Sequence, residues 1–226
     1  MANRLYFVSQ PNTNMIFEER NCDFDYHKGF ALSQKQKCIK SLHESINQEN
    51  PFLRILEIST KSTQLLGVAL SAFNLELYNK ENDKKFCLEN VFQSSKVFEK
   101  GGPYIDLLYV KPKEAKRDER LNSSGELIHF YYENQIWPTN PKTMFYDWIY
   151  IAALNSSIEV SRLILEFDTF TDIEFNHKKS INCQARAAAI FVSLKKSCLL
   201  EEYLSDFDKF KTIYRDMYES EQITLF

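Results

Sequence analysis

The chain has 226 residues, with 28 Lys and Arg against 31 Asp and Glu, and its net charge is therefore −3. A mildly acidic chain is a poor candidate for tight non-specific binding of nucleic acid, which needs a basic face, so any DNA contact must come from a local patch. The aromatic content is high and Gly and Pro are few, which is typical of a folded chain with a substantial core.

Five cysteines are scattered without a Cys-x-x-Cys pair, and four histidines lack paired spacing, so we expect neither a disulfide framework nor a zinc site. No apolar stretch reaches the length of a secretory signal or of a transmembrane helix. We therefore expect a cytoplasmic protein with reduced thiols and no membrane contact.

The first 60 residues are predicted to form an extension of strands and one helix. From Leu5 to Phe30 the pattern is strand-like, with a break at Pro11-Asn12. Capping-box spacing at Ser33 predicts a helix over Gln34 to Gln48. Leu53 to Ile58 then has the composition of a buried strand.

The central feature is a helical pattern from Leu88 to Phe98, closed by a Gly-Gly-Pro stop that ends at Pro103. Glu89, Gln93 and Lys96 fall on the border of its apolar face, where aromatic neighbours would partly desolvate them. The acid and the amine would be roughly 10 Å apart along such a helix, too far for an ion pair but within reach of one ligand. An ordinary amphipathic helix with a solvated border is the alternative interpretation.

The segment after this stop is predicted to be extended over Tyr104 to Val110, and Pro112 suits the first position of a helix. The mixed charge run from Lys111 to Arg120 is either a solvated helix or, through its Arg forks, an anion-binding segment. Leu127 to Tyr132 is a predicted strand.

Helical patterns complete the chain. One helix is expected to open at Pro141, a second to run from Ser156 to about Phe167, and a buried third to span Ala185 to Leu194. Leu199 to Tyr218 is amphipathic and predicts a C-terminal helical tail over 199–226. Since no repeat or linker divides the chain, we expect one α+β domain over 1–226, dominated by helices with a few short strands.

Several short motifs resemble those of one family. The run Glu89-Asn90-Val91-Phe92-Gln93-Ser94-Ser95-Lys96 resembles the E-x-x-F-Q-x-x-K helix of the NADAR (YbiA-like) family. Leu70-Ser71-Ala72-Phe73-Asn74-Leu75 is similar to its S-x-F loop. Asp172 and Asn182 match the acid and the amide of its D-x-x-W-G … N-x-x-G closing motif, with Phe175 in place of Trp.

The resemblance covers about residues 70–194 and is strongest to the branch found as antitoxins beside DarT-type DNA ADP-ribosyltransferase toxins. The Gly-rich loop of relatives is replaced here by Asn176-His177-Lys178-Lys179, so the usual backbone cradle for a phosphate is missing. The fold it implies is YbiA-like.

This resemblance implies an N-glycosidase-type hydrolase that removes ADP-ribose from guanine bases in DNA, as antitoxin to a DarT-type toxin. ADP-ribosylated DNA would be the substrate, ADP-ribose the product, and the toxin a possible partner; the scheme requires no metal and no cofactor. Glu89 would stabilise the oxocarbenium-like transition state or act as base, with Asp172 as its partner. Lys96 would be either an anion clamp or an amine that captures the ring-opened sugar as an imine.

The resemblance also implies a set of substrate-binding residues: Ser71, Phe73, Asn74, Phe92, Gln93, Arg117, Arg120, Trp137 and Asn182. The pyrophosphate would lie near the basic segment Lys116 to Arg120, or near Lys178 and Lys179. For Phe73 and Trp137 core packing is the simpler interpretation, although Trp137 could stack on a base.

Two other functions are compatible with the same motifs. One is a YbiA-type N-glycosidase that acts on small phosphoribosyl-amine metabolites. The other is a non-enzymatic antitoxin that binds its toxin and keeps a vestigial pocket, although the retained Glu, Gln, Lys, Asp and Asn set argues against it.

Overall fold

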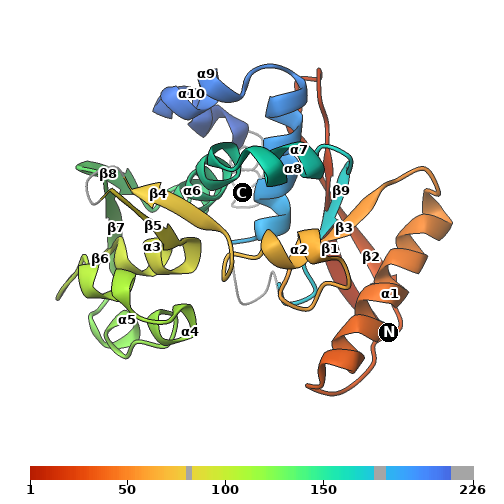
Figure 1. Ribbon diagram of the computed structural model, residues 1–226, viewed down its shortest axis with the longest axis horizontal. Helices are drawn as coiled ribbons and strands as arrows, with labels where there is room; N and C mark the ends of the chain where they lie inside the picture. Colours follow the sequence, from red (N-terminus) through yellow and green to blue (C-terminus); the bar gives the residue numbers. More distant parts are fainter. Residues whose placement is uncertain (80–82, 176–181, 215–226) are drawn as a thin grey trace, which may run out of the picture.

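The computed structural model describes residues 1–79, 83–175 and 182–214 (Figure 1). It confirms the α+β class. The strands are β1 Ala2–Ser9, β2 Phe17–Phe24, β3 Ile55–Glu57, β4 Glu76–Asn79, β5 Lys84–Cys87, β6 Lys96–Phe98, β7 Leu127–Tyr132, β8 Gln135–Pro138 and β9 Thr169–Thr171. The helices are α1 Leu32–Glu49, α2 Leu65–Ala69, α3 Leu88–Ser94, α4 Pro112–Ala115, α5 Arg120–Ser123, α6 Met144–Ser156, α7 Ile158–Ile164, α8 Gln184–Lys196, α9 Leu200–Ser205 and α10 Phe207–Lys211, with the 3-10 helices η1 Ile105–Tyr109 and η2 Thr212–Tyr214.

One sheet has the strand order β2-β1-β9-β3, in which only the β9–β3 pair is parallel. Its central strand β1 buries both faces, because successive side chains of a strand point to opposite sides. Tyr6 and Val8 join the hydrophobic cluster beneath α1, whereas Phe7 joins the larger cluster that contains α8. Helix α1 covers the sheet face that carries Tyr6 and Val8. Its buried side chains there are Cys38, Ile39, Leu42 and Ile46.

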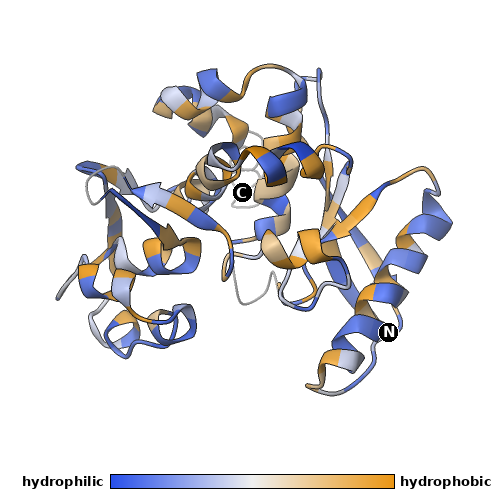
Figure 2. Cartoon of the chain, viewed as in Figure 1, coloured by the Kyte–Doolittle hydropathy of each residue, from blue (hydrophilic) through white to orange (hydrophobic). Residues whose placement is uncertain are grey.

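The middle of the molecule is formed by α6 and α8. Figure 2 shows α1 as largely hydrophilic and these two central helices as mostly apolar. Every residue from Ala185 to Leu194 is buried, which confirms the predicted buried helix. A buried ion pair joins the two helices: Arg186 Nε donates to Asp147 Oδ2 over 3.0 Å.

The other half of the fold combines the β4–β5 hairpin, the sheet β6-β7-β8 and the short helices α3, η1, α4 and α5 (Figure 1). Aromatic rings fill the space between this half and α6. Phe130 lies 4.7 Å from Phe145 and 5.5 Å from Phe92, between ring centres. These contacts fix α3 against the core, and with it the side chains at its surface.

The predicted helix over Leu88 to Phe98 is wrong in its second half. Helix α3 ends at Ser94, and Lys96 is the first residue of β6, paired with Phe130 of β7. The hydroxyls of Ser94 and Ser95 donate to the Val91 carbonyl, at 3.1 and 2.7 Å, and such bonds compete with continuation of a helix. From β6 the Lys96 amine still reaches Gln93 of α3.

Other boundaries also differ from the predictions. The segment Tyr104 to Val110 contains the 3-10 helix η1 instead of a strand, since the Asn90 amide donates to its Leu107 and Val110 carbonyls. The capping box at Ser33 does not form, and α1 begins at Leu32 without a side-chain cap.

Further along the chain, a turn closed by the Met144 N–H and the Pro141 carbonyl delays the start of α6. Over residues 199–214 the predicted continuous tail is broken into α9, α10 and η2, because Asp206 caps a new helix by accepting from the Lys209 N–H. The rest of the predicted tail, 215–226, lies outside the described residues.

Candidate functional site

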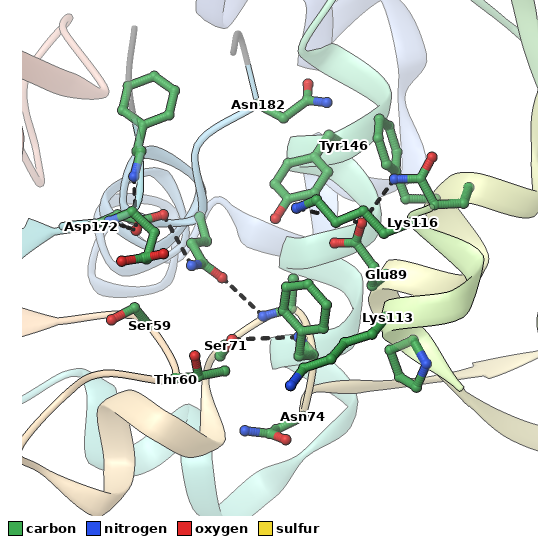
Figure 3. A pocket seen from close by; sticks show the side chains of 18 of the residues that line it. Ser59, Thr60, Ser71, Asn74, Glu89, Lys113, Lys116, Tyr146, Asp172 and Asn182 are labelled. Carbon is green, nitrogen blue, oxygen red and sulfur yellow. Dashed lines mark hydrogen bonds and ion pairs between the residues drawn. The ribbon is translucent and has the colours of Figure 1, made fainter. Parts of the chain in front are cut away.

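A cleft of about 1220 Å³ lies between the β2-β1-β9-β3 sheet and the α3–α4 region. In Figure 3, Asp172 and Ser59 lie on one side of it, and Glu89 and Lys116 on the other. Ten of the twelve predicted site residues line this cleft: Ser71, Phe73, Asn74, Glu89, Phe92, Gln93, Lys96, Arg117, Asp172 and Asn182. Residues that are as far apart in sequence as Ser71 and Asn182 are thus brought together.

Glu89, Gln93 and Lys96 form a hydrogen-bonded chain along one wall. Gln93 Nε2 donates to Glu89 Oε1 over 2.8 Å, and Lys96 Nζ donates to Gln93 Oε1 over 2.7 Å. The carboxylate can only accept and donates nothing to the amide, so its bond fixes Gln93 Nε2 toward Glu89 and leaves Oε1 to accept from Lys96. The chain holds an acid and an amine at a constant separation without a direct ion pair.

The surroundings of Lys96 favour its neutral form. The amine is largely removed from water and lies above the Phe92 ring. Burial lowers the pKa of Lys96 to about 8; the Lys116 charge acts in the same direction and the Glu89 carboxylate opposes it. Both protonation states of the amine are therefore populated near pH 8.

Glu89 is the most enclosed acid on this wall, with 4% of its surface exposed. Besides the Gln93 bond it faces Lys116, whose Nζ lies 3.8 Å from Oε1. Lys116 is more than half exposed and lies over the Phe73 ring, 5.1 Å from its centre. An exposed cation thus partners a buried carboxylate at the surface of the cleft.

A second carboxyl group, that of Asp172, is held on the opposite side. Its Oδ1 accepts the N–H groups of Glu174 and Phe175, at 3.0 and 3.2 Å, and its Oδ2 accepts Gln184 Nε2 at 3.0 Å. The Gln184 amide oxygen accepts the Ala72 N–H at 2.9 Å (Figure 3). Gln184 therefore links Asp172 to the loop that contains Ser71 and Phe73.

The S-x-F loop is shaped by its own polar groups. The Ser71 carbonyl accepts the N–H groups of Asn74 and Leu75, each at 2.8 Å, and Asn74 Nδ2 donates to the Val68 carbonyl at 2.8 Å. These bonds turn the chain so that Phe73 is half-buried at the cleft and Asn74 is exposed at its edge.

A basic arm, defined here as residues 111–117, forms the rim of the cleft. Its charged side chains are largely exposed and include Lys111, Lys113, Lys116 and Arg117, with Glu114 between them. Helix α4 brings these cations to one side of the opening.

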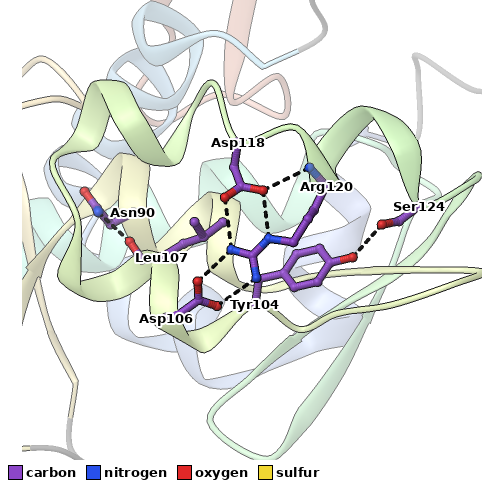
Figure 4. A network of polar contacts seen from close by, with 7 residues as sticks. All are labelled: Asn90, Tyr104, Asp106, Leu107, Asp118, Arg120 and Ser124. Atoms are coloured by element: carbon purple, nitrogen blue, oxygen red, sulfur yellow. Dashed lines mark hydrogen bonds and ion pairs between the residues drawn. The ribbon is translucent and has the colours of Figure 1, made fainter.

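Arg120 does not line the cleft, and its predicted role as a substrate ligand is not supported by its position. It instead binds Asp106 and Asp118, which precede and follow the basic arm in the chain (Figure 4). Its guanidinium is bidentate to Asp106, at 3.2 and 2.6 Å, and also bonds Asp118 through Nε at 2.8 Å, while the group lies 4.4 Å from the centre of the Tyr104 ring. These hydrogen bonds hold the pKa of both carboxyls below their usual range.

Trp137 is also outside the cleft and cannot stack on a base there. It is 2% exposed and packs against Trp148, Phe145 and Phe207, at centre distances of 4.8, 5.5 and 5.3 Å. Strand β8 pairs with β7 and turns this indole into the core, so core packing, the simpler interpretation, is the correct one.

The sequence analysis does not predict three parts of the cleft lining: Tyr146, Gln184 and the loop 59–61. Tyr146 lies among core residues of α6, so a helical pattern marks it only as packing. Gln184 is two residues after Asn182 in the closing motif, the one local signal that could have pointed to it. The predicted phosphate contacts of Lys178 and Lys179 lie outside the described residues.

In residues 1–79, 83–175 and 182–214, no group of three His, Cys, Asp or Glu side chains is arranged to hold a metal ion. Within the same ranges, no helix combines the length and the apolar character that crossing a membrane requires.

Comparison with protein-family models identifies the chain. The model described as DarT1-associated NADAR antitoxin matches residues 2–224, which is nearly the whole sequence. No curated protein matches the chain. The chain belongs to the family of DarT1-associated NADAR antitoxins.

Proposed function

We propose that this protein is an N-glycosidase-type hydrolase that removes ADP-ribose from guanine bases in DNA and so reverses the action of a DarT-type toxin. The observation that carries this proposal is the Glu89–Gln93–Lys96 chain on the wall of the cleft. Family membership supports the antitoxin role.

The size and charge of the cleft suit such a substrate. Sites for drug-sized ligands typically occupy roughly 300–1,000 Å³, so a cleft of about 1220 Å³ can accept a nucleoside diphosphate sugar together with a base. The basic arm would contact the pyrophosphate, since Arg117 and Lys113 can bind phosphate oxygens at the rim. The adjacent acids would then lie near the sugar.

The bond to be broken joins the anomeric carbon to a guanine nitrogen. Its cleavage builds positive charge on the sugar, which the enclosed Glu89 carboxylate would stabilise, or Glu89 would activate the attacking water. Asp172, with its carboxyl on the opposite side, would supply the proton that the leaving nitrogen needs. Gln93 would keep Glu89 in place while the charge develops.

Lys96 would act as a nucleophile rather than as a fixed cation. Its neutral amine would add to the anomeric carbon as the C–N bond breaks, and guanine would leave with the electron pair of that bond and the proton from Asp172. The glycosyl-lysine would then open its ring: the C–O bond breaks, the ring oxygen takes up a proton from the amine, and a lysine imine remains. Water would then cleave the imine to ADP-ribose and the free amine. A pKa of about 8 supports this role, because it leaves a large neutral fraction under mildly alkaline conditions.

An assay on two DNA substrates tests the proposal. Purified protein is incubated with oligonucleotides that contain ADP-ribosylated guanine or ADP-ribosylated thymine, and released ADP-ribose is measured by mass spectrometry. We expect release from the guanine-linked DNA alone. Release from a phosphoribosyl-amine metabolite but from neither DNA would instead favour the small-molecule N-glycosidase, and no release with tight toxin binding would favour a non-enzymatic antitoxin.

A further inference from the structure

A buried acid lies behind the cleft without lining it. Glu57, the last residue of β3, is 1% exposed. Its Oε1 accepts the Ile173 N–H at 2.9 Å and the Ser59 hydroxyl at 2.7 Å, and its Oε2 accepts the Thr171 hydroxyl at 2.6 Å. Thr171 and Ile173 are the two neighbours of Asp172 in the chain. One carboxylate thus holds the residue before Asp172 and the residue after it.

A third element, α1, supports this acid through Thr171. The Thr171 hydroxyl gives its proton to Glu57, so its oxygen must accept from His43 Nε2, which lies 2.9 Å away. Burial lowers the pKa of His43 to about 4, so the ring is neutral at physiological pH and carries its proton on Nε2. The bonds therefore run in one direction, from His43 through Thr171 to Glu57.

The groups that face Asp172 come from several elements and are mostly acidic or hydroxylic. They are Glu57 of β3, Glu174 of the same loop, Tyr146 and Tyr150 of α6, and Cys183 and Gln184 at the start of α8. Lys35 of α1 pairs with Glu174 at 2.9 Å. Burial and then the Glu57 charge raise the pKa of Asp172 to about 7.

We propose that Glu57 positions Asp172 for the reaction, by binding the Thr171 hydroxyl and the Ile173 N–H on either side of that residue and by placing a second negative charge behind it. This inference rests on the proposed function of the cleft. Two carboxylates so close together do not both ionise readily, and one of them keeps a proton. Among the described residues, Asp172 Oδ2 accepts one hydrogen bond, from Gln184. This oxygen can carry the proton toward the leaving nitrogen, and the electron pair of the broken C–N bond then takes it up.

Glu57→Gln distinguishes the effect of the Glu57 charge from the effect of its hydrogen bonds, because it removes the charge and keeps the shape of the side chain. The glutamine oxygen can still accept from Ile173 and Ser59, and its NH2 group can donate to Thr171 Oγ1. The Thr171 hydroxyl would then donate to Nε2 of His43, in the tautomer that carries the ring proton on Nδ1. Glu57→Ala removes both the charge and the scaffold. Glu166→Gln, an exposed acid between α7 and β9 whose partner is Arg54, is the matched control.

The first measurement is the titration of the Asp172 carboxyl by carbon-13 NMR in the free protein, which needs no substrate. In Glu57→Gln we expect its midpoint to fall by about one pH unit or more, and in Glu166→Gln to stay within about 0.2 units. An unchanged midpoint in Glu57→Gln would overturn the inference, whatever the substrate proves to be.

The second measurement is the pH profile of kcat on guanine-linked DNA. In Glu57→Gln the alkaline limb should move to lower pH by the same interval, so that kcat at pH 8 falls about tenfold while KM changes less than about threefold. In Glu57→Ala kcat should fall further than in Glu57→Gln, because the alanine removes the hydrogen bonds as well as the charge. An unmoved limb would overturn the inference. A shifted NMR midpoint in a protein that is inactive on both DNAs would refute the proposed function but leave the Glu57–Asp172 coupling in place.

Discussion

The amine of Lys96 lies 4.7 Å from the centre of the Phe92 ring. The ring shields the nitrogen from water, and the attraction between cation and ring only partly compensates for the lost hydration. This explains why the pKa of Lys96 falls to about 8 although Glu89 lies nearby. The placement of Lys96 over Phe92, at the junction of α3 and β6, therefore sets the chemistry of the amine.

The first prediction concerns pH. If neutral Lys96 is the nucleophile and protonated Asp172 the acid, kcat should rise about tenfold per pH unit below about pH 7, level off between pH 7 and 8 and fall above pH 8. Because the unfolded chain holds this proton up to about pH 10.5, the free energy of unfolding should also rise between pH 8 and 10.5. Rate profiles and urea unfolding of the wild type measure the two effects.

A matched pair of variants checks the assignment to Lys96. Lys96→Met should abolish the rise of stability over that range. Lys116→Gln removes a charge that lowers the pKa of Lys96 and should move the kinetic midpoint near pH 8 to higher pH. If that midpoint is the same in Lys116→Gln as in the wild type, the group that titrates is not Lys96.

The second prediction concerns the imine. Borohydride added during turnover should attach ADP-ribose covalently to the wild type, because it reduces an imine to a stable amine, and mass spectrometry should locate the adduct on Lys96. Lys96→Ala should trap nothing and should lose about 10² or more in kcat. If trapping fails in the wild type and Lys96→Arg keeps appreciable activity, the residue is an anion clamp.

The third prediction concerns Glu89. Glu89→Gln keeps the shape of the side chain but removes the charge that would face the oxocarbenium ion, so kcat should fall by about 10² or more. The exposed Glu44→Gln on α1 is the control and should retain full activity. Near-normal turnover in Glu89→Gln, with a folded protein by circular dichroism, would exclude the residue from the mechanism.

Much of the site could be predicted because many of its residues lie within short sequence motifs. Glu89, Phe92 and Gln93 share one turn of a helix, and the family resemblance assigned them together. Lys96 lines the cleft, but not as a residue of the predicted helix. The periodic pattern continues the helix through Lys96, whereas the hydroxyl bonds of Ser94 and Ser95 end it at Ser94. Periodicity carries no signal for such hydroxyl bonds.

The residues that could not be predicted depend on tertiary contacts. Arg120 has the same charge and neighbourhood in sequence as Arg117, and only the folding of Asp106 and Asp118 around it removes it from the cleft. Glu57 appears in sequence as the polar residue of a hydrophobic strand. Its relation to Asp172 exists only because β3 and β9 pair in parallel, which residue patterns do not specify.

The fourth prediction concerns the basic arm. Neutralising two exposed cations in Lys113→Gln/Arg117→Gln should weaken ADP-ribose binding by about tenfold or more, since each hydrogen bond from a charged donor contributes on the order of 1.5–3 kcal/mol. Binding by the wild type should weaken with salt, and the double variant should show a smaller salt dependence. Isothermal titration calorimetry at two ionic strengths measures both, with the exposed Lys40→Gln as control. Unchanged affinity would place the pyrophosphate elsewhere.

The last prediction concerns the buried ion pair between α6 and α8. Asp147 Oδ2 accepts from Arg186 Nε at 3.0 Å, from the Thr143 hydroxyl at 3.0 Å and from the Tyr214 hydroxyl at 2.8 Å. Asp147→Ala would leave the Arg186 charge buried without this partner and should lower the free energy of unfolding by about 3–5 kcal/mol, or Tm by roughly 10 °C. The exposed Asp208→Ala should change it by less than about 0.5 kcal/mol. Asp147→Leu combined with Arg186→Met should recover much of the loss, because well-packed apolar side chains can replace such a pair; a loss below about 1 kcal/mol in Asp147→Ala would contradict a structural role for it.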